Sequence, residues 1–130
     1  MAIEATVRPG PRGQSIIARD DKIMSGSMTP RYPFVMERGQ GAHVWDVDCN
    51  EYIDFAAGIA VNSTGHSHPE VLKAIIEQAQ KFVHIAGTDY YYEVQIQLAE
   101  RLASLAPFSE GARVFLTNSG AEAVEGTIKV

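Results

Sequence analysis

Apolar positions along the first half of the chain come in short runs that are separated by turn residues. The runs cover residues 34–37, 42–47 and 52–55, with 39–41 and 48–51 as the intervening turns. Closely spaced runs of this kind, rich in β-branched and aromatic residues, are typical of strands joined by hairpin turns. The pattern predicts a three-stranded antiparallel meander.

Further along, the apolar positions change to helical spacing. A helix is predicted to begin at Pro69, because a proline in the first turn has no N–H to leave unpaired. Its apolar face comprises Val71, Leu72, Ile75, Ala79 and Phe82. A second helix is predicted over residues 93–105, with Pro107 ending it. Its buried stripe comprises Val94, Leu98, Leu102 and Leu105.

The last 20 residues read as strand, turn and helix. The continuous apolar run Val114, Phe115 and Leu116 predicts a strand covered on both faces, as in a parallel α/β sheet. A turn at 118–120 then leads into a helix over 121–130, which shows no glycine or proline stop signal. One strand and one unfinished helix cannot form a covered sheet. We therefore expect a fragment of a longer enzyme, or a truncated reading frame.

Two stretches of the sequence show neither the strand pattern nor the helical spacing of apolar residues. Residues 1–15 are rich in Pro, Gly and Arg and are predicted to form an extended arm, with a short helix over 15–24 and irregular chain over 25–33. Residues 56–67 are mostly Ala, Gly and small polar residues. This composition favours a loop whose backbone closely approaches another group.

Charge and composition exclude several partners. The 11 Lys and Arg are dispersed and the net charge is -5, so no basic stripe is present to bind nucleic acid. No apolar run is long enough to span a membrane. Cys49 is the only cysteine, which excludes an intrachain disulfide and a cysteine metal cage. A cytoplasmic protein is expected.

The strongest chemical signal is the turn before the last predicted helix. A helix N-terminus presents unpaired N–H groups and partial positive charge, so it can hold a phosphate without a cationic side chain. Gly120 would allow close approach, and Ser119 can donate a hydrogen bond or cap the helix. A simple helix cap is the alternative. A nucleophile elbow is disfavoured, because Thr117 and Ala121 stand where glycines are needed.

Two apparent metal motifs do not hold. Alternating oxygen side chains at 46–50 imitate a calcium loop, but Glu51 replaces the required glycine and Ala57 the required glutamate, so a hairpin turn is favoured. His66 and His68 lack further ligands apart from Glu70, which the helix would carry away, so capping and loop packing are favoured.

The run Tyr90, Tyr91 and Tyr92 could face a cofactor ring, although packing at an interface is more usual.

Together these segments resemble the class III aminotransferases that act on 4-aminobutyrate, ornithine and acetylornithine. The similar stretches are PGP at 9–11, AHVWDVD at 42–48, EYIDF at 51–55, AAGIAVN at 56–62, GHSHP at 65–69 and NSGAEAVE at 118–125. They follow one another in order over nearly the whole chain. Cys49 departs from the pattern, since the family usually has glycine in that turn.

The resemblance implies an α/β protein of fold-type I, the fold of pyridoxal-5'-phosphate (PLP) dependent transferases. Residues 1–65 would form the arm and meander of the small domain, and residues 66–130 the start of the large PLP-binding domain. Ser119, Gly120 and Ala121 would hold the PLP phosphate, and Ile59 and Thr88 would lie near the substrate. The full-length enzyme would be a homodimer or a dimer of dimers.

The implied reaction transfers an amino group from an ω-amino acid to a 2-oxo acid such as 2-oxoglutarate, so the partners are small molecules. The lysine that forms a Schiff base with PLP would lie beyond Val130, and none of Lys22, Lys73, Lys81 and Lys129 matches its position. The 130-residue chain alone is therefore expected to be inactive. An aminomutase or racemase on the same scaffold, or a non-catalytic module that binds a phosphate ligand, remains an alternative.

Overall fold

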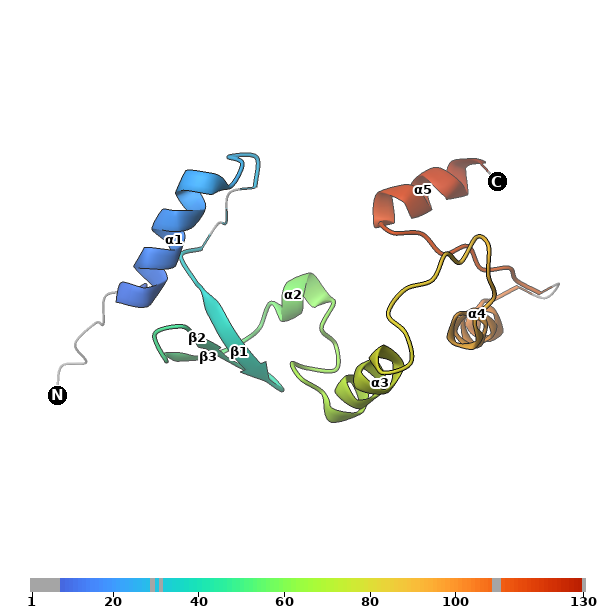
Figure 1. Cartoon of the computed structure of the whole chain (residues 1–130), viewed down its shortest axis with the longest axis horizontal. Coiled ribbons are helices and arrows are strands. Elements are labelled where there is room, and N and C mark those ends of the chain that lie inside the picture. The colour runs from blue at the N-terminus through green and yellow to red at the C-terminus, as the bar shows by residue number, and fades with distance from the viewer. Residues whose placement is uncertain (1–7, 29, 31, 109–110, 130) are drawn as a thin grey trace. The chain divides into compact units, whose positions relative to one another are not determined.

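The computed structural model describes residues 8–28, 30, 32–108 and 111–129. Contacts divide the chain into two units, Met1–Lys81 and Phe82–Val130, and each is described by itself. The elements of the first unit are α1 (Pro11–Ile23), β1 (Met36–Gln40), β2 (His43–Asp46), β3 (Glu51–Ile53), α2 (Ala57–Ala60) and α3 (Pro69–Ala79) (Figure 1). Those of the second are α4 (Glu93–Leu105) and α5 (Gly120–Lys129). The domain boundary near residue 65 stays a prediction.

The predicted meander is confirmed. Its strands follow the order β1-β2-β3, and both pairs are antiparallel. The predicted turn at 39–41 is wrong, however, because Gly39 pairs with Val44 and Gln40 with His43. The chain reverses after them, where Gly41 adopts the left-handed region at φ 57°, a conformation that suits glycine. The first strand therefore extends three residues beyond its apolar run, because backbone pairing does not require apolar side chains.

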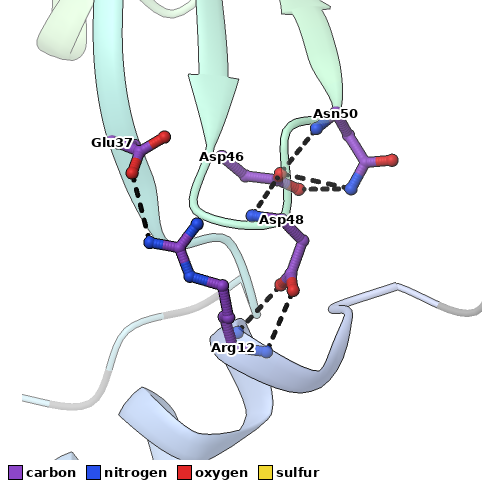
Figure 2. Close-up of polar contacts among 6 residues, drawn as sticks. Arg12, Glu37, Asp46, Asp48 and Asn50 are labelled. Atoms are coloured by element: carbon purple, nitrogen blue, oxygen red, sulfur yellow. Dashed lines mark hydrogen bonds and ion pairs between the residues drawn. The ribbon is translucent and has the colours of Figure 1, made fainter.

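The prediction of an extended arm through residue 15 is wrong, since α1 begins at Pro11. Its first turn is capped from the β2–β3 turn, where the Asp48 carboxylate accepts hydrogen bonds from the N–H groups of Arg12 (2.9 Å) and Gly13 (2.8 Å) (Figure 2). The Arg12 side chain also donates to Glu37 of β1 at 3.3 Å. A proline in the first turn of a helix is no breaker. Residues 1–7 of the predicted arm lie outside the described residues.

The β2–β3 turn is organised by Asp46, which confirms a hairpin turn at the apparent calcium motif. Its buried carboxylate accepts hydrogen bonds from the N–H groups of Asp48 (3.0 Å) and Asn50 (2.8 Å) and from the side chain of Asn50 (2.8 Å) (Figure 2). The Tyr52 hydroxyl donates a further hydrogen bond to it at 3.0 Å. Cys49 takes the left-handed conformation at φ 66°. The turn keeps this geometry without glycine because Asp46 satisfies its backbone donors.

The buried side chains of the described residues lie in the meander. Among the described residues, Val44 and Val47 are the buried apolar side chains. The helices α3 and α4 begin where the sequence predicts, but neither contains a buried residue. Their apolar stripes are partly exposed because no described element packs over them. Phe82 is not on α3, which ends at Ala79, and its ring instead meets that of Tyr92 edge-on at 5.9 Å.

The strand predicted at 114–116 is not formed. In the described part of the second unit, residues 111–117 have no strand partner, and Phe115 is 75% exposed. The reason is that a parallel strand exists only when neighbouring strands supply its hydrogen bonds. The helix that follows is present as α5.

Candidate functional site

The turn that leads into α5 is a capped helix start. The Ser119 hydroxyl oxygen accepts a hydrogen bond from the Glu122 N–H at 3.2 Å, and the Asn118 N–H donates to the Glu122 carboxylate at 2.8 Å. This reciprocal arrangement resembles a capping box, although the carboxylate binds the residue before the cap. The Ser119 carbonyl oxygen also accepts from the Ala123 N–H at 3.1 Å. The cap that the sequence allowed for Ser119 is therefore present.

Capping leaves donors available. Within the described chain, no hydrogen-bond partner is found for the N–H groups of Gly120 and Ala121, and the Ser119 hydroxyl keeps its own hydrogen free to donate. A Cβ built on Gly120 would meet nothing within 4 Å, so the approach is open. Two backbone N–H groups, one hydroxyl and the positive end of the helix dipole form a donor set that fits a phosphate.

Ile59 lies in an unusual turn. All four residues of α2 have left-handed backbone, with φ of 45° at Ala57, 63° at Gly58, 64° at Ile59 and 64° at Ala60. Left-handed backbone costs an L-residue about 1–2 kcal/mol, and more at a β-branched residue. The Ile59 side chain is 93% exposed. The sequence predicts a loop here but not this conformation.

Asp54 and His66 anchor this turn at its base. One Asp54 carboxylate oxygen accepts from the N–H groups of Ala56 (2.8 Å) and Ala57 (2.9 Å), and the other lies 2.7 Å from Nε2 of His66. The hydrogen bond from His66 and those from Ala57 and Ala56 lower the pKa of Asp54 below its ordinary value of 3.8. This pair is not predicted from the sequence. The available signal was the spacing of Asp54 to the following N–H groups, which is that of an Asx-turn.

The two histidines weighed as metal ligands have other surroundings. The backbone of His66 exchanges two hydrogen bonds with Gly41, of 2.8 and 2.9 Å. His68 is the cap residue of α3, and its Nδ1 is buried without a described partner. Across the described ranges, no three His, Cys, Asp or Glu side chains gather closely enough to hold a metal ion.

The remaining site residues belong to the second unit. Thr88 is exposed, in a turn closed by hydrogen bonds from the N–H groups of Asp89 and Tyr90 to the Ala86 carbonyl oxygen, both 3.0 Å. Tyr91 is 97% exposed. Ser119, Gly120 and Ala121 lie in this same unit, whereas Ile59 lies in the first. The predicted site residues thus fall in both units, and all of them stay predicted site residues.

Residues 24–130 match the family model described as aminotransferase class-III. The chain belongs to the class III aminotransferases. An acetylornithine aminotransferase of Bifidobacterium longum is 53% identical over 96 residues, which are 74% of this chain and 22% of that protein. The resemblance seen in the sequence is thereby confirmed.

Solved structures of aminotransferases share the fold. Acetylornithine aminotransferase from Elizabethkingia anophelis is similar with a TM-score of 0.81 at 33% identity, over 90% of this chain and 29% of that one. Ornithine aminotransferase from Toxoplasma gondii, described with partial occupancy of PLP at its active site, has a TM-score of 0.80 at 33% identity, over 90% and 26%. The fold is that of fold-type I aminotransferases, and this class III family is PLP-dependent. The chain spans less than a third of the length of these relatives.

None of the helices in the described ranges is long and apolar enough to cross a membrane.

Proposed function

We propose that this chain forms the N-terminal part of an aminotransferase that moves an amino group from an ω-amino acid to a 2-oxo acid such as 2-oxoglutarate. The observation that carries the proposal is the 53% identity to an acetylornithine aminotransferase. Acetylornithine and ornithine are the preferred candidate amines, and 4-aminobutyrate is a third. The amine and the oxo acid are small molecules, and a homodimer or dimer of dimers is proposed for the full-length protein.

PLP is the proposed cofactor, and the donors at the start of α5 fit its phosphate. The N–H groups of Gly120 and Ala121 and the Ser119 hydroxyl would hold that phosphate, while the α5 dipole favours its negative charge. When bound, PLP supplies the electron sink that makes amino transfer possible. The fixed phosphate orients the cofactor. Ile59 and Thr88 are proposed to line the amine side of the site.

The lysine that forms a Schiff base with PLP is proposed to lie outside these 130 residues, so that the chain alone does not catalyse amino transfer. We also propose a cytoplasmic location, with which the single cysteine of these 130 residues is compatible.

The reaction can be tested on the full-length protein that carries this sequence, supplied with PLP. Acetylornithine, ornithine and 4-aminobutyrate would each be incubated with and without 2-oxoglutarate, and glutamate and the amine product would be measured. We expect glutamate to form in equal amount to the amine consumed. Without 2-oxoglutarate, no more amine should be consumed than there is PLP to accept its amino group. Conversion of an amine beyond that amount without any oxo acid would instead indicate an aminomutase or racemase. PLP binding without conversion would indicate a binding module.

A further inference from the structure

The segment between Asp54 and His66 is closed by a single carboxylate. Asp54 receives the N–H groups of Ala56 and Ala57 at one end of the segment and the His66 ring at the other. The Asp54 backbone is itself fixed, because its N–H donates to the Ala42 carbonyl oxygen at 2.8 Å. The side chains of Asp54 and His66 are 16% and 20% exposed, so water competes little for this contact. The meander thus holds both ends of the loop at one point.

The second ring nitrogen of His66 is also engaged. In the amide orientation that satisfies hydrogen bonding at both of its ends, the Asn62 nitrogen donates to the Gly65 carbonyl oxygen at 3.0 Å, and its oxygen accepts from Nδ1 of His66 at 2.9 Å. Both ring nitrogens then lie within hydrogen-bond distance of an oxygen, one of Asp54 and one of Asn62. The contact between Asp54 and His66 is therefore linked to Asn62 as well.

Packing does not hold the left-handed turn. Ile59 is 93% exposed and α2 contains no buried residue. Within the turn, the Ala60 N–H donates to the Ala56 carbonyl oxygen (3.0 Å) and the Asn62 N–H to that of Ala57 (2.9 Å). Strained backbone persists only where surrounding structure imposes it. In the described structure, the side chain that imposes the left-handed backbone is that of Asp54, which accepts hydrogen bonds from the N–H groups of Ala56 and Ala57.

We propose that Asp54, paired with His66, is a positioning residue that holds the left-handed turn and thereby sets where Ile59 stands against the amine substrate. The selectivity part rests on the proposed function, whereas the holding of the turn does not. Asp54 does not touch the reacting atoms. It acts through the backbone of Ala56 and Ala57, and loss of its carboxylate frees Ile59 from one fixed place.

The test compares four variants of the full-length protein. Asp54→Ala removes two hydrogen bonds from backbone N–H groups and the contact with His66. Asp48→Ala is the matched control, because Asp48 also accepts two backbone N–H groups, but those of α1. Asp54→Asn is the conservative variant, because its side-chain oxygen can still accept from the N–H groups of Ala56 and Ala57, and its side-chain nitrogen still lies against Nε2 of His66.

Two readouts are needed, amide hydrogen exchange over residues 56–62 without substrate, and the ratio of kcat/KM for acetylornithine to that for 4-aminobutyrate. We expect Asp54→Ala to exchange about tenfold faster there and to shift the ratio about fivefold or more. Asp48→Ala should leave both at parent values, and Asp54→Asn should restore both. His66→Leu, which keeps the two backbone bonds, should shift both less, and it replaces Asp54→Ala if that variant does not fold.

Parent-like exchange in the Asp54→Ala and His66→Leu variants would overturn the inference. So would equal shifts of the amine ratio in Asp54→Ala and Asp48→Ala, because a general loss of stability would then explain both. A parent protein that transfers no amino group would refute the proposed function instead. The two failures are distinguishable because exchange is measured without substrate.

Discussion

At the start of α5, two adjacent residues carry different parts of the proposed phosphate contact. Ser119 is already used as a cap, so its hydroxyl can contribute one donated hydrogen bond. Gly120 contributes its N–H and the absence of a side chain. A backbone-dominated phosphate site should therefore be more sensitive to Gly120 than to Ser119.

Cofactor affinity tests this order. Ser119→Ala removes a hydrogen bond to a charged group and should weaken PLP binding by about 1.5–3 kcal/mol. Gly120→Val should weaken it more, because a branched side chain would stand where phosphate oxygens approach, although the protein itself has room for it. Dissociation constants by fluorescence titration, with circular dichroism to confirm folding, measure both. Parent-like affinity in Gly120→Val would reduce this turn to a helix cap.

The lowered pKa values of two aspartates, Asp46 and Asp54, predict that the fold is less stable in acid. Burial alone would raise the pKa of Asp46, but hydrogen bonds from Asn50, Tyr52 and the Asp48 N–H outweigh it, so the pKa lies below the ordinary 3.8. The pKa of Asp54 is lowered too. A depressed carboxyl pKa contributes stability that is present above the ordinary value and is lost as pH falls through the folded value.

The free energy of unfolding should therefore fall more steeply below about pH 4 in the parent than in Asp46→Asn. Asparagine keeps an acceptor but cannot take up a proton. Urea unfolding of the full-length protein from about pH 3 to 6 measures the difference between the two curves. Parallel curves would mean that Asp46 does not contribute to the acid response.

At the scale of elements, the sequence predicts those helices whose starts depend on interactions between residues close together in the chain. The starts of α3 and α4 follow from apolar spacing and, for α3, from Pro69. The start of α1 was missed, because its cap, Asp48, lies 36 residues from Arg12 along the chain. The pairing of Asp54 with His66 was missed for the same reason, at a separation of 12. The strand at 114–116 was wrong because its partner strands are absent from the described residues.

Helix α1 also depends on a close backbone approach at Gly10. A Cβ at that position would lie 2.6 Å from Cγ of Asp48, so Gly10→Ala should displace the carboxylate and destabilise the protein. We expect a loss of about 1–3 kcal/mol in the free energy of unfolding. Gly26→Ala is the matched control, since a Cβ there would meet nothing within 4 Å. Urea unfolding of both variants measures the effect, and equal values for the two would contradict the close approach.

For the whole molecule, the residues that stabilise the fold differ in burial from those proposed to bind the cofactor and the substrate. Among the residues that the structure describes, the buried side chains lie in the meander, whereas the proposed phosphate turn and Ile59 are exposed. Exposure at a site is expected, because its groups must reach a ligand. Ser119 and Gly120 can be proposed as site residues from their local order in the sequence alone. The geometry of Ile59 cannot, because it depends on the contact between Asp54 and His66 across the loop.

The cap that Asp48 provides to α1 also bears on the order in which the chain folds. Forming the first turn of a helix is the unfavourable step, because several residues become fixed for one hydrogen bond. Here two acceptors for that turn arrive only once the β2–β3 hairpin has closed, 35 and 36 residues further on. The hairpin can therefore act as a template on which α1 nucleates, so that the earlier segment in the sequence becomes ordered after the later one.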